Sequence, residues 1–192
     1  MHLFFKGPRG MGKSSLLRQK LLPYEKSLGG FVVQRLMEEG RRIGFRAVTL
    51  EQGYPKLEAA CTRDLSGVFI LRGNKKTSVL EEVLAAVQKD ICKRECKLIV
   101  LDEIGGIELL SSNFMCVLEQ ILQSGKPCIG VLKSADNLAH MVSELRLGDG
   151  YFQQYDLLEK MILLRGDIIA LDQKECSNMD PYIEDFFVRM LF

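Results

Sequence analysis

The sequence lacks the residue patterns that mark a structural zinc site. It contains only two histidines, His2 and His140, which stand far apart, and none of its six cysteines forms a C-x-x-C pair. Zinc is therefore not expected, and reduced, mostly buried thiols of a cytosolic protein are the better interpretation of the cysteines. The cysteines are Cys61, Cys92, Cys96, Cys116, Cys128 and Cys176.

Long apolar runs and an excess of one charge are also missing. No stretch approaches the roughly 18 uninterrupted apolar residues of a membrane-spanning helix. A glycine-rich loop begins at residue 6, so we expect no signal peptide. The 26 basic and 25 acidic side chains leave a formal charge of +1, which gives no overall attraction to nucleic acid or an anionic membrane. We expect a cytoplasmic protein without a membrane or nucleic-acid partner.

The remaining composition is that of an ordinary globular chain. Hydrophobic residues make up 47% of the 192 residues, which is enough for one full-sized core. No repeat, low-complexity tract or linker interrupts the sequence. We therefore expect a single domain over residues 1–192.

The first informative feature is the stretch "KGPRGMGKSS", residues 6–15. Gly7, Gly12, Lys13 and Ser14 fit G-x-x-x-x-G-K-[ST], the phosphate-binding loop of P-loop NTPases. The apolar "HLFFKG" predicts a buried strand before the loop, and the leucine pattern of "SSLLRQKLL" predicts a helix after it. A chance glycine-rich turn rarely has this context on both sides, so the motif predicts a nucleotide site.

The chemistry of such a loop assigns roles to its residues. Glycines let successive backbone N–H groups point inward, and the new helix adds its positive end. Lys13 would reach the β- and γ-phosphates, and the Ser14 hydroxyl would bind Mg²⁺. The predicted nucleotide-binding residues here are Gly7, Pro8, Arg9, Gly10, Met11, Gly12, Lys13, Ser14 and Ser15.

A second acidic contribution to the site comes from "CKLIVLDEIGG". The apolar run Leu98 to Leu101 predicts a buried parallel strand. It ends in Asp102 and Glu103, at the edge where open α/β sheets bind ligands. Asp102 suits the Walker B role of holding Mg²⁺, and Glu103 suits the base that activates a water. An acidic pair at a strand end is usually only solvated, but the P-loop about 90 residues earlier favours the functional interpretation.

The segments between and after these motifs indicate the fold. "GGFVVQRL", "RRIGFRAVTL" and "SGVFILRG" predict strands, with "MEEG" as a hairpin turn. We expect an α/β, three-layer P-loop NTPase fold with a mainly parallel central sheet and a small antiparallel β extension at 30–72, between Walker A and Walker B.

Further helices and strands are expected towards the C-terminus. Helical patterns occupy "SVLEEVLAAVQKDICKREC", "NFMCVLEQILQSG" and "DNLAHMVSELRLG", the last capped by Asp136 or Asn137. "KPCIGVLKS" predicts a core strand with Lys133 and Ser134 at its carboxyl end. We expect strand-rich structure in "YFQQYDLLEKMILLRGDIIALDQ" and a terminal helix beginning near Pro181.

Together, "KGPRGMGKSSLL", "GGFVVQRLMEEGRRIGFRAVTL" and "LIVLDEIGGIELLSSNF" resemble the cancer-related nucleoside-triphosphatase family. The resemblance covers roughly the first two-thirds of the chain, and "EGRRIGF" is more specific than the P-loop. It implies a single α/β domain and hydrolysis of nucleoside triphosphates, ATP or GTP, to diphosphate and phosphate with broad base specificity. It also implies that Leu101, Asp102, Glu103, Ile104 and Gly105 belong to the nucleotide site.

Several polar positions of that family are replaced here. Its pattern G-F-x-T-x-E-[IV]-R reads "GFVVQRLM" in this chain, so Val33, Arg35 and Met37 stand for threonine, glutamate and arginine. Gly106 stands for the lysine of D-E-I-G-K-M-E. The replaced groups bear on rate and base recognition, whereas the phosphate- and magnesium-binding residues are intact.

Three functions are compatible with these residues. The first is a Mg²⁺-dependent NTPase with Lys13 and Glu103 as catalytic residues and Arg42 (or its neighbour Arg41) stabilising charge on the γ-phosphoryl group. The second is a nucleotide or small-molecule kinase, which needs an acceptor pocket and an arginine-rich lid; "LRLGDG" is poor in arginine. The third is a nucleotide-binding regulatory module that has lost useful catalysis and acts on an unspecified protein partner.

Overall fold

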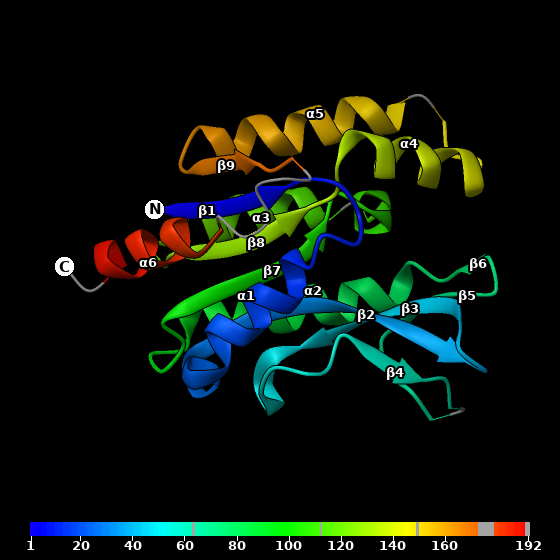
Figure 1. Cartoon of the computed structure of the whole chain (residues 1–192), viewed down its shortest axis with the longest axis horizontal. Coiled ribbons are helices and arrows are strands. Elements are labelled where there is room, and N and C mark those ends of the chain that lie inside the picture. The colour runs from blue at the N-terminus through cyan, green and yellow to red at the C-terminus, as the bar shows by residue number, and fades with distance from the viewer. Residues whose placement is uncertain (63, 112, 149, 173–178, 191–192) are drawn as a thin grey trace.

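The computed structural model describes residues 1–62, 64–111, 113–148, 150–172 and 179–190 (Figure 1). One sheet of nine strands runs through it. The strands are β1 (His2–Lys6), β2 (Leu28–Glu38), β3 (Arg41–Thr49), β4 (Glu58–Ala60), β5 (Val68–Leu71), β6 (Asn74–Lys75), β7 (Leu98–Ile104), β8 (Cys128–Leu132) and β9 (Asp167–Ala170). The helices are α1 (Lys13–Leu21), α2 (Ser78–Cys92), α3 (Phe114–Gln123), α4 (Ala135–Glu144), α5 (Gly150–Leu163) and α6 (Met179–Met190).

The centre of the sheet is parallel, and one edge is antiparallel. The strand order is β6-β5-β3-β2-β7-β8-β1-β9, with β4 paired to β2 outside this path. Strands β2, β7, β8, β1 and β9 are mutually parallel neighbours. Strands β3, β5 and β6 add antiparallel pairs. The expected α/β fold with a mainly parallel sheet and an antiparallel extension is confirmed.

Strand β2 joins the two parts of the sheet. Its first half pairs in parallel with β7, from Leu28 beside Leu98 to Val32 beside Asp102. Its second half continues past Asp102 and forms the predicted hairpin with β3, with the turn at Glu39 and Gly40. The hairpin therefore extends beyond the carboxyl ends of the parallel strands, towards the expected site.

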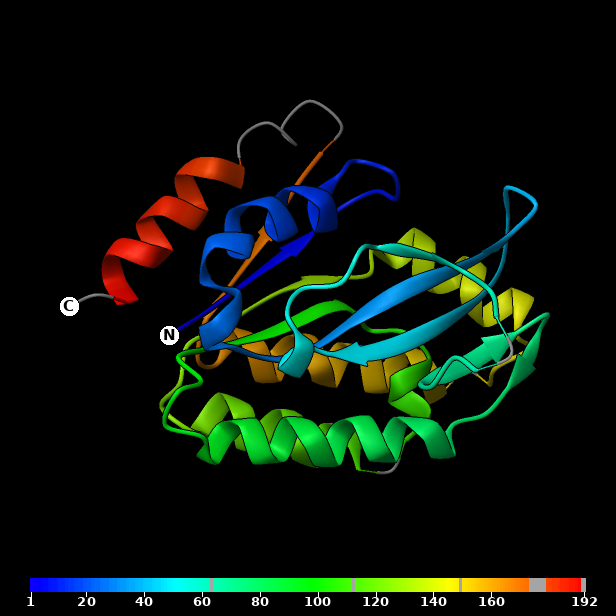
Figure 2. The same cartoon turned by 90° about the horizontal axis from the view of Figure 1, so that it is seen from below.

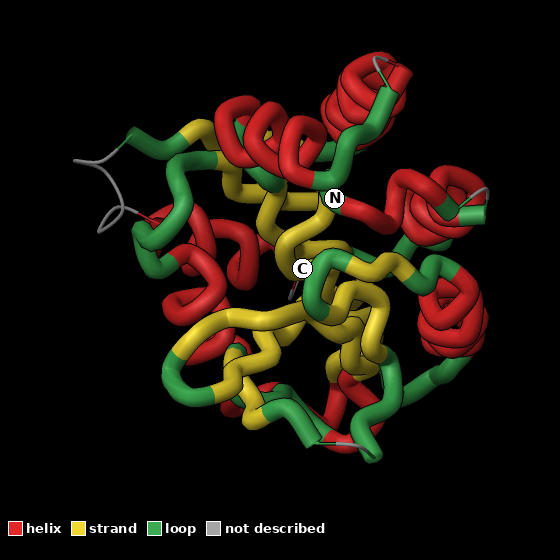
Figure 3. Tube along the Cα trace, turned by 90° about the vertical axis from the view of Figure 1, so that its right-hand side faces the viewer, coloured by secondary structure: helices red, strands yellow, loops and turns green. Residues whose placement is uncertain are grey.

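Helices cover both faces of the sheet because successive strand residues point to opposite sides. Phe4 packs in the core beneath α2, α3, α4 and α5, whereas Leu3 and Phe5 pack in the core beneath α1 and α6. Figure 2 shows α1 and α6 (blue and red) on one side and α2 (green) on the other, and Figure 3 shows the strands between helices. The layers confirm the three-layer prediction.

One predicted element is wrong. The segment beginning at Tyr151, expected to be strand-rich, is helix α5, and only β9 follows as a strand. Tyr151, Tyr155, Leu158 and Ile162 are its buried residues, a spacing of three and four that places one helix face on the core. The period of the apolar residues is therefore that of a helix, not of a strand.

Smaller details also differ from the predictions. Helix α4 is capped by the Ser134 side chain, which accepts the backbone N–H of Asn137, so the cap lies before both predicted residues.

Cys96 and Cys128 are buried, but Cys92 and Cys116 are exposed, so the thiols are not mostly buried. Cys176 lies outside the described residues. The terminal helix begins at Met179, near Pro181 as predicted. Within the part of the chain that the structure describes, no helix combines the length and apolarity of a membrane span.

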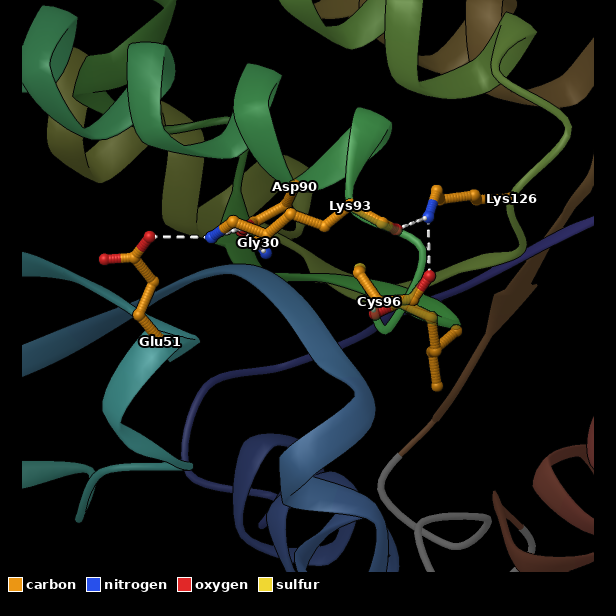
Figure 4. A network of polar contacts seen from close by, with 7 residues as sticks. Gly30, Glu51, Asp90, Lys93, Cys96 and Lys126 are labelled. Atoms are coloured by element: carbon orange, nitrogen blue, oxygen red, sulfur yellow. Dashed lines mark hydrogen bonds and ion pairs between the residues drawn. The ribbon is translucent and has the colours of Figure 1, made fainter.

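A buried polar network ties α2 to the sheet near the amino ends of β2 and β7 (Figure 4). Asp90, only 2% exposed, accepts the backbone N–H of Gly30 at 2.9 Å and the Lys93 ammonium at 2.8 Å. Lys93 also contacts Glu51 at 2.7 Å, and Lys126 donates to the carbonyl oxygens of Lys93 and Cys96. The network lies away from the motif residues, so substitutions in it should change the stability of the fold and not the predicted site.

We expect Asp90→Ala to lower the free energy of unfolding by about 2–3 kcal/mol, because it leaves the Gly30 N–H buried without an acceptor. Glu51→Gln should cost under about 1 kcal/mol, since Glu51 contributes an exposed ion pair. Urea denaturation of both variants provides the measurement. Equal losses would show that the bond to Gly30 carries no special weight.

Candidate nucleotide and magnesium site

The predicted phosphate loop connects β1 to the first turn of α1. Gly10 and Gly12 have φ angles of 83° and 85°, in the left-handed region that favours glycine. A Cβ added at either position would meet no atom within 4 Å, so the backbone conformation and not lack of space requires glycine there. The loop curls accordingly, and α1 begins at Lys13, so the positive end of the helix faces the loop.

The Lys13 side chain lies inside this loop. It is 8% exposed, and its ammonium donates hydrogen bonds to the carbonyl oxygens of Gly7 at 2.8 Å and Pro8 at 2.6 Å. These contacts hold the positive charge across the concave side of the loop. A fixed charge in that place suits the β- and γ-phosphates of a nucleotide.

Asp102 and Ser14 connect the two motifs. The Ser14 hydroxyl donates to Asp102 Oδ1 at 2.8 Å, and Asp102 is 1% exposed at the carboxyl end of β7. Burial raises the pKa of Asp102 to about 7, although the hydrogen bond from Ser14 acts to lower it. A cation beside Asp102 would favour its charged form.

The residues around Asp102 fit a magnesium ion. Asp102 Oδ2 and the Tyr54 hydroxyl are buried and have no hydrogen-bond partner of normal geometry among the described residues. The two groups are neighbours: after burial, the charge of Asp102 and a side-chain contact with it, poorer than a normal hydrogen bond, raise the pKa of Tyr54. No group of three or more His, Cys, Asp or Glu side chains in the described ranges could hold a metal. The Asp102 carboxylate and the Ser14 hydroxyl suit Mg²⁺, which takes its other ligands from water and substrate phosphates.

Glu103 is positioned by an irregularity in β7. Its φ is 65°, which is strained for a residue with a side chain, and the pairing of β7 with β8 shifts register between Leu101 and Ile104. The bulge turns the Glu103 side chain towards Lys133, which follows β8. Glu103 Oε1 and Lys133 Nζ are 3.1 Å apart, and both side chains are largely buried.

The charge state of Glu103 follows from these contacts. Burial alone would raise its pKa, but the charge and hydrogen bond of Lys133, followed by the charges of Arg35 and Arg9, outweigh burial and lower the pKa of Glu103. Glu103 is therefore a carboxylate at neutral pH. In this state it can accept a proton from water.

Two adjoining cavities are lined by part of the predicted site. A cavity of about 130 Å³ is lined by Glu103, Arg35 and Lys133 and by the loop residues Arg9, Gly10, Gly12, Lys13, Ser14 and Ser15. Gly7, Pro8, Met11, Leu101, Asp102, Ile104 and Gly105 line neither cavity. A cavity of about 670 Å³ lies beyond Glu103, and Arg42 lines it and not the smaller one. The structure thus brings the loop, Asp102 and Glu103 together. It places Arg42 one cavity away, with its guanidinium 5.0 Å from the ring centre of Phe45.

Sequence reasoning did not assign Arg35, Lys133 and Tyr54 to the site. Arg35 comes from the part of β2 that extends past Asp102, and Tyr54 comes from the loop after β3. Lys133 had a signal in the sequence, because it directly follows a core strand at the ligand-binding edge of the sheet. Arg35 and Tyr54 had none, since the register of β2 places Arg35 and the course of the loop after β3 places Tyr54.

Gly106 has a direct relation to Lys133. A Cβ at position 106 would lie 2.5 Å from Lys133 Cε and 3.0 Å from Glu108 Oε2. The Lys133 side chain therefore occupies the space next to Gly106, where the resembling family carries a lysine. This chain has a lysine ammonium beside Glu103 even though position 106 has no side chain.

Comparisons with known proteins agree with this geometry. A family model described as NTPase matches residues 2–160. A nucleoside-triphosphatase THEP1 of Thermotoga petrophila is 34% identical over 154 residues, 78% of this chain and 80% of that protein. The mouse cancer-related nucleoside-triphosphatase homolog is 30% identical over 64% of this chain and 70% of its own.

Two solved structures have the same fold. The crystal structure of THEP1 from Aquifex aeolicus matches with a TM-score of 0.52 and 22% identity, covering 93% of this chain and 96% of that one. The solution structure of a human cancer-related nucleoside triphosphatase matches with a TM-score of 0.53 and 21% identity, covering 96% and 97%. With its intact phosphate loop and its Asp102–Glu103 pair, this chain belongs to the NTPase family.

Proposed function

We propose that this protein hydrolyses nucleoside triphosphates, ATP or GTP among them, to diphosphate and phosphate, with Mg²⁺ as cofactor and little selection among bases. The observation that carries the proposal is the joining of the two motifs by the 2.8 Å bond from Ser14 to Asp102, with Glu103 beside them. Family membership supports hydrolysis. A cytoplasmic location belongs to the same proposal.

Each residue has a distinct task in this reaction. The loop N–H groups and Lys13 bind the β- and γ-phosphates, and Ser14 and Asp102 would hold Mg²⁺, which neutralises charge on the triphosphate when it is bound. Glu103 orients a water molecule and accepts its proton as the oxygen attacks the γ-phosphorus. The bond from that phosphorus to the bridging oxygen breaks, and its electron pair leaves with the diphosphate.

The positions of the arginines reduce the number of candidates for the one that stabilises the transition state. Arg9 and Arg35 line the phosphate cavity, whereas Arg42 lines only the adjoining one. The charge of Arg42 still reaches Glu103, since the two groups influence each other electrostatically. Arg42 stays our prediction for the residue that stabilises charge on the γ-phosphoryl group. Measuring kcat for Arg35→Ala, Arg41→Ala and Arg42→Ala would rank the three candidates by their loss of rate.

Phosphate release tests the proposed function. We expect release from a panel of NTPs and dNTPs that depends on Mg²⁺ and is abolished by chelation with EDTA. Asp102→Asn should weaken Mg²⁺-dependent nucleotide binding, because it removes the carboxylate charge. Release that persists in EDTA, or in Asp102→Asn at limiting Mg²⁺, would argue against the magnesium assignment.

We expect Lys133→Ala to lower kcat about tenfold or more, because a charged hydrogen bond at the γ-phosphate end of the cavity is lost. Gly106→Lys in the same chain should restore part of the rate, since truncation of Lys133 empties the space that a side chain at position 106 would enter. Gly106→Lys alone should impair the enzyme because it collides with Lys133. Steady-state phosphate release compares the four proteins; no rescue in the double variant would refute the equivalence of the two lysines.

A kinase is the second candidate, and one observation favours it: a cavity large enough for an acceptor adjoins Glu103. A regulatory module without turnover is the third candidate, favoured by the apolar residues Val33 and Met37. Phosphate release with and without candidate acceptors separates these functions from hydrolysis.

A further inference from the structure

The larger cavity is formed by segments far apart in the sequence. Strands β3 and β5 contribute Phe45, Phe69 and Ile70, and helix α4 contributes His140 and Met141. Its volume of about 670 Å³ is within the roughly 300–1,000 Å³ of small-molecule sites. The cavity could therefore hold a ligand as large as a nucleotide.

The cavity meets the phosphate site at a shared wall. Arg9, Glu103, Lys133 and Asn137 line both cavities. In phosphoryl transfer, the attacking group and the leaving diphosphate lie on opposite sides of the γ-phosphorus. Because Glu103 is proposed to activate the attacking group, the cavity beyond it lies on the attacking side. The cavity is therefore not on the side where the nucleoside diphosphate and its base leave.

The lining combines an aromatic platform with cations. The rings of Phe45 and Phe69 are stacked, with centroids 6.4 Å apart and planes inclined by 12°. The Arg42 guanidinium lies 5.0 Å from the centre of the Phe45 ring. Phe69 is 4% exposed and Phe45 is half-buried, so a planar ring in the cavity would contact mainly Phe45, backed by Phe69. The arginine beside Phe45 suits a neighbouring anion.

The cavity lining carries charges of both signs, but two of its cations are not held in ion pairs. Its acidic side chains are Glu103, Glu108, Asp136 and Glu144. Neither Arg9 nor Arg42 forms an ion pair with a carboxylate among the residues that the structure describes. Burial, and then the charge of Arg9, lower the pKa of Arg42, although Glu144 and Glu103 act in the opposite direction. Two close guanidinium groups in a partly buried place are stabilised by an anionic group between them.

We propose that the larger cavity is a binding site for a second ligand, a nucleoside monophosphate, with its base on the Phe45–Phe69 platform and its phosphate towards Arg42 and Arg9. A nucleoside monophosphate joins the planar ring and the anion that these residues suit. The proposal rests on the proposed function for the position of Glu103, but binding itself does not require hydrolysis.

The test is equilibrium binding of AMP, GMP and dTMP by calorimetry to a Lys13→Ala protein, in which the phosphate loop is disabled. We expect saturable binding of at least one of them, weakened about tenfold or more by adding Arg42→Ala. Adding Arg41→Ala, the exposed neighbour, should change affinity less than twofold. Saturable binding that Arg42→Ala weakens and Arg41→Ala leaves unchanged is assigned to the larger cavity, because Arg42 lines that cavity and not the phosphate cavity.

Phe45 variants complete the test in the wild-type background. Phe45→Leu preserves apolar volume and removes the ring, and it should weaken the monophosphate while leaving ATP affinity within twofold. Absence of saturable binding up to several millimolar, or binding insensitive to Arg42→Ala and Phe45→Leu, would overturn the site. A matching loss of ATP affinity in Phe45→Leu would also overturn it, because the cavity would then hold the base of the triphosphate. Phosphate release without any monophosphate reports separately on hydrolysis.

Discussion

Lys13→Ala should reduce the affinity for ATP about 100- to 1,000-fold, because the ammonium supplies charged hydrogen bonds to the β- and γ-phosphates. The side chain is already held across the loop by the carbonyl oxygens of Gly7 and Pro8. Little conformational freedom is therefore lost when a nucleotide binds. Titration calorimetry in the presence of Mg²⁺ measures the effect.

Lys20→Ala is the matched control for this variant. Lys20 lies on the same helix but pairs with Asp180 on α6, away from the loop. Its removal should leave ATP affinity unchanged. An ATP affinity that Lys13→Ala leaves intact, in a protein with a wild-type circular dichroism spectrum, would mean that the loop binds something other than nucleotide phosphates.

Glu103→Gln should lower kcat by about 10²–10⁴-fold, the usual loss when a general base is removed. Glutamine keeps the size of glutamate and can still accept a hydrogen bond from Lys133, but it cannot take a proton from water. Affinity for the nucleotide should stay within about threefold, because removing a negative charge near the triphosphate changes binding only modestly. Single-turnover phosphate release and calorimetry separate the two quantities.

Substitution of the neighbouring carboxylate, Asp102, should give a different phenotype. Asp102→Asn should mainly weaken binding that depends on Mg²⁺, whereas Glu103→Gln should mainly slow the chemical step. If the wild-type protein turns over no faster than Glu103→Gln, then Glu103 is not the base. The protein would then be better described as a nucleotide-binding module.

The sequence by itself determined the parts of the site that are local. The phosphate loop needs only glycines at left-handed φ angles, a strand before it and a helix after it, all within about 20 residues. The parallel strand before Asp102 was likewise readable from a continuous apolar run. Helix α5 differs from the strand-rich expectation, although the spacing of Tyr151, Tyr155 and Leu158 carries the helical signal.

The tertiary structure decided which distant side chains surround those motifs. The register of β2 against β7 carries Arg35 past Asp102, and the bulge at Glu103 turns its carboxylate to Lys133. The larger cavity exists because β3 and β5 face α4, which follows them by more than sixty residues. Such contacts depend on strand pairing and helix packing across the whole sheet, and no local pattern in the chain records them.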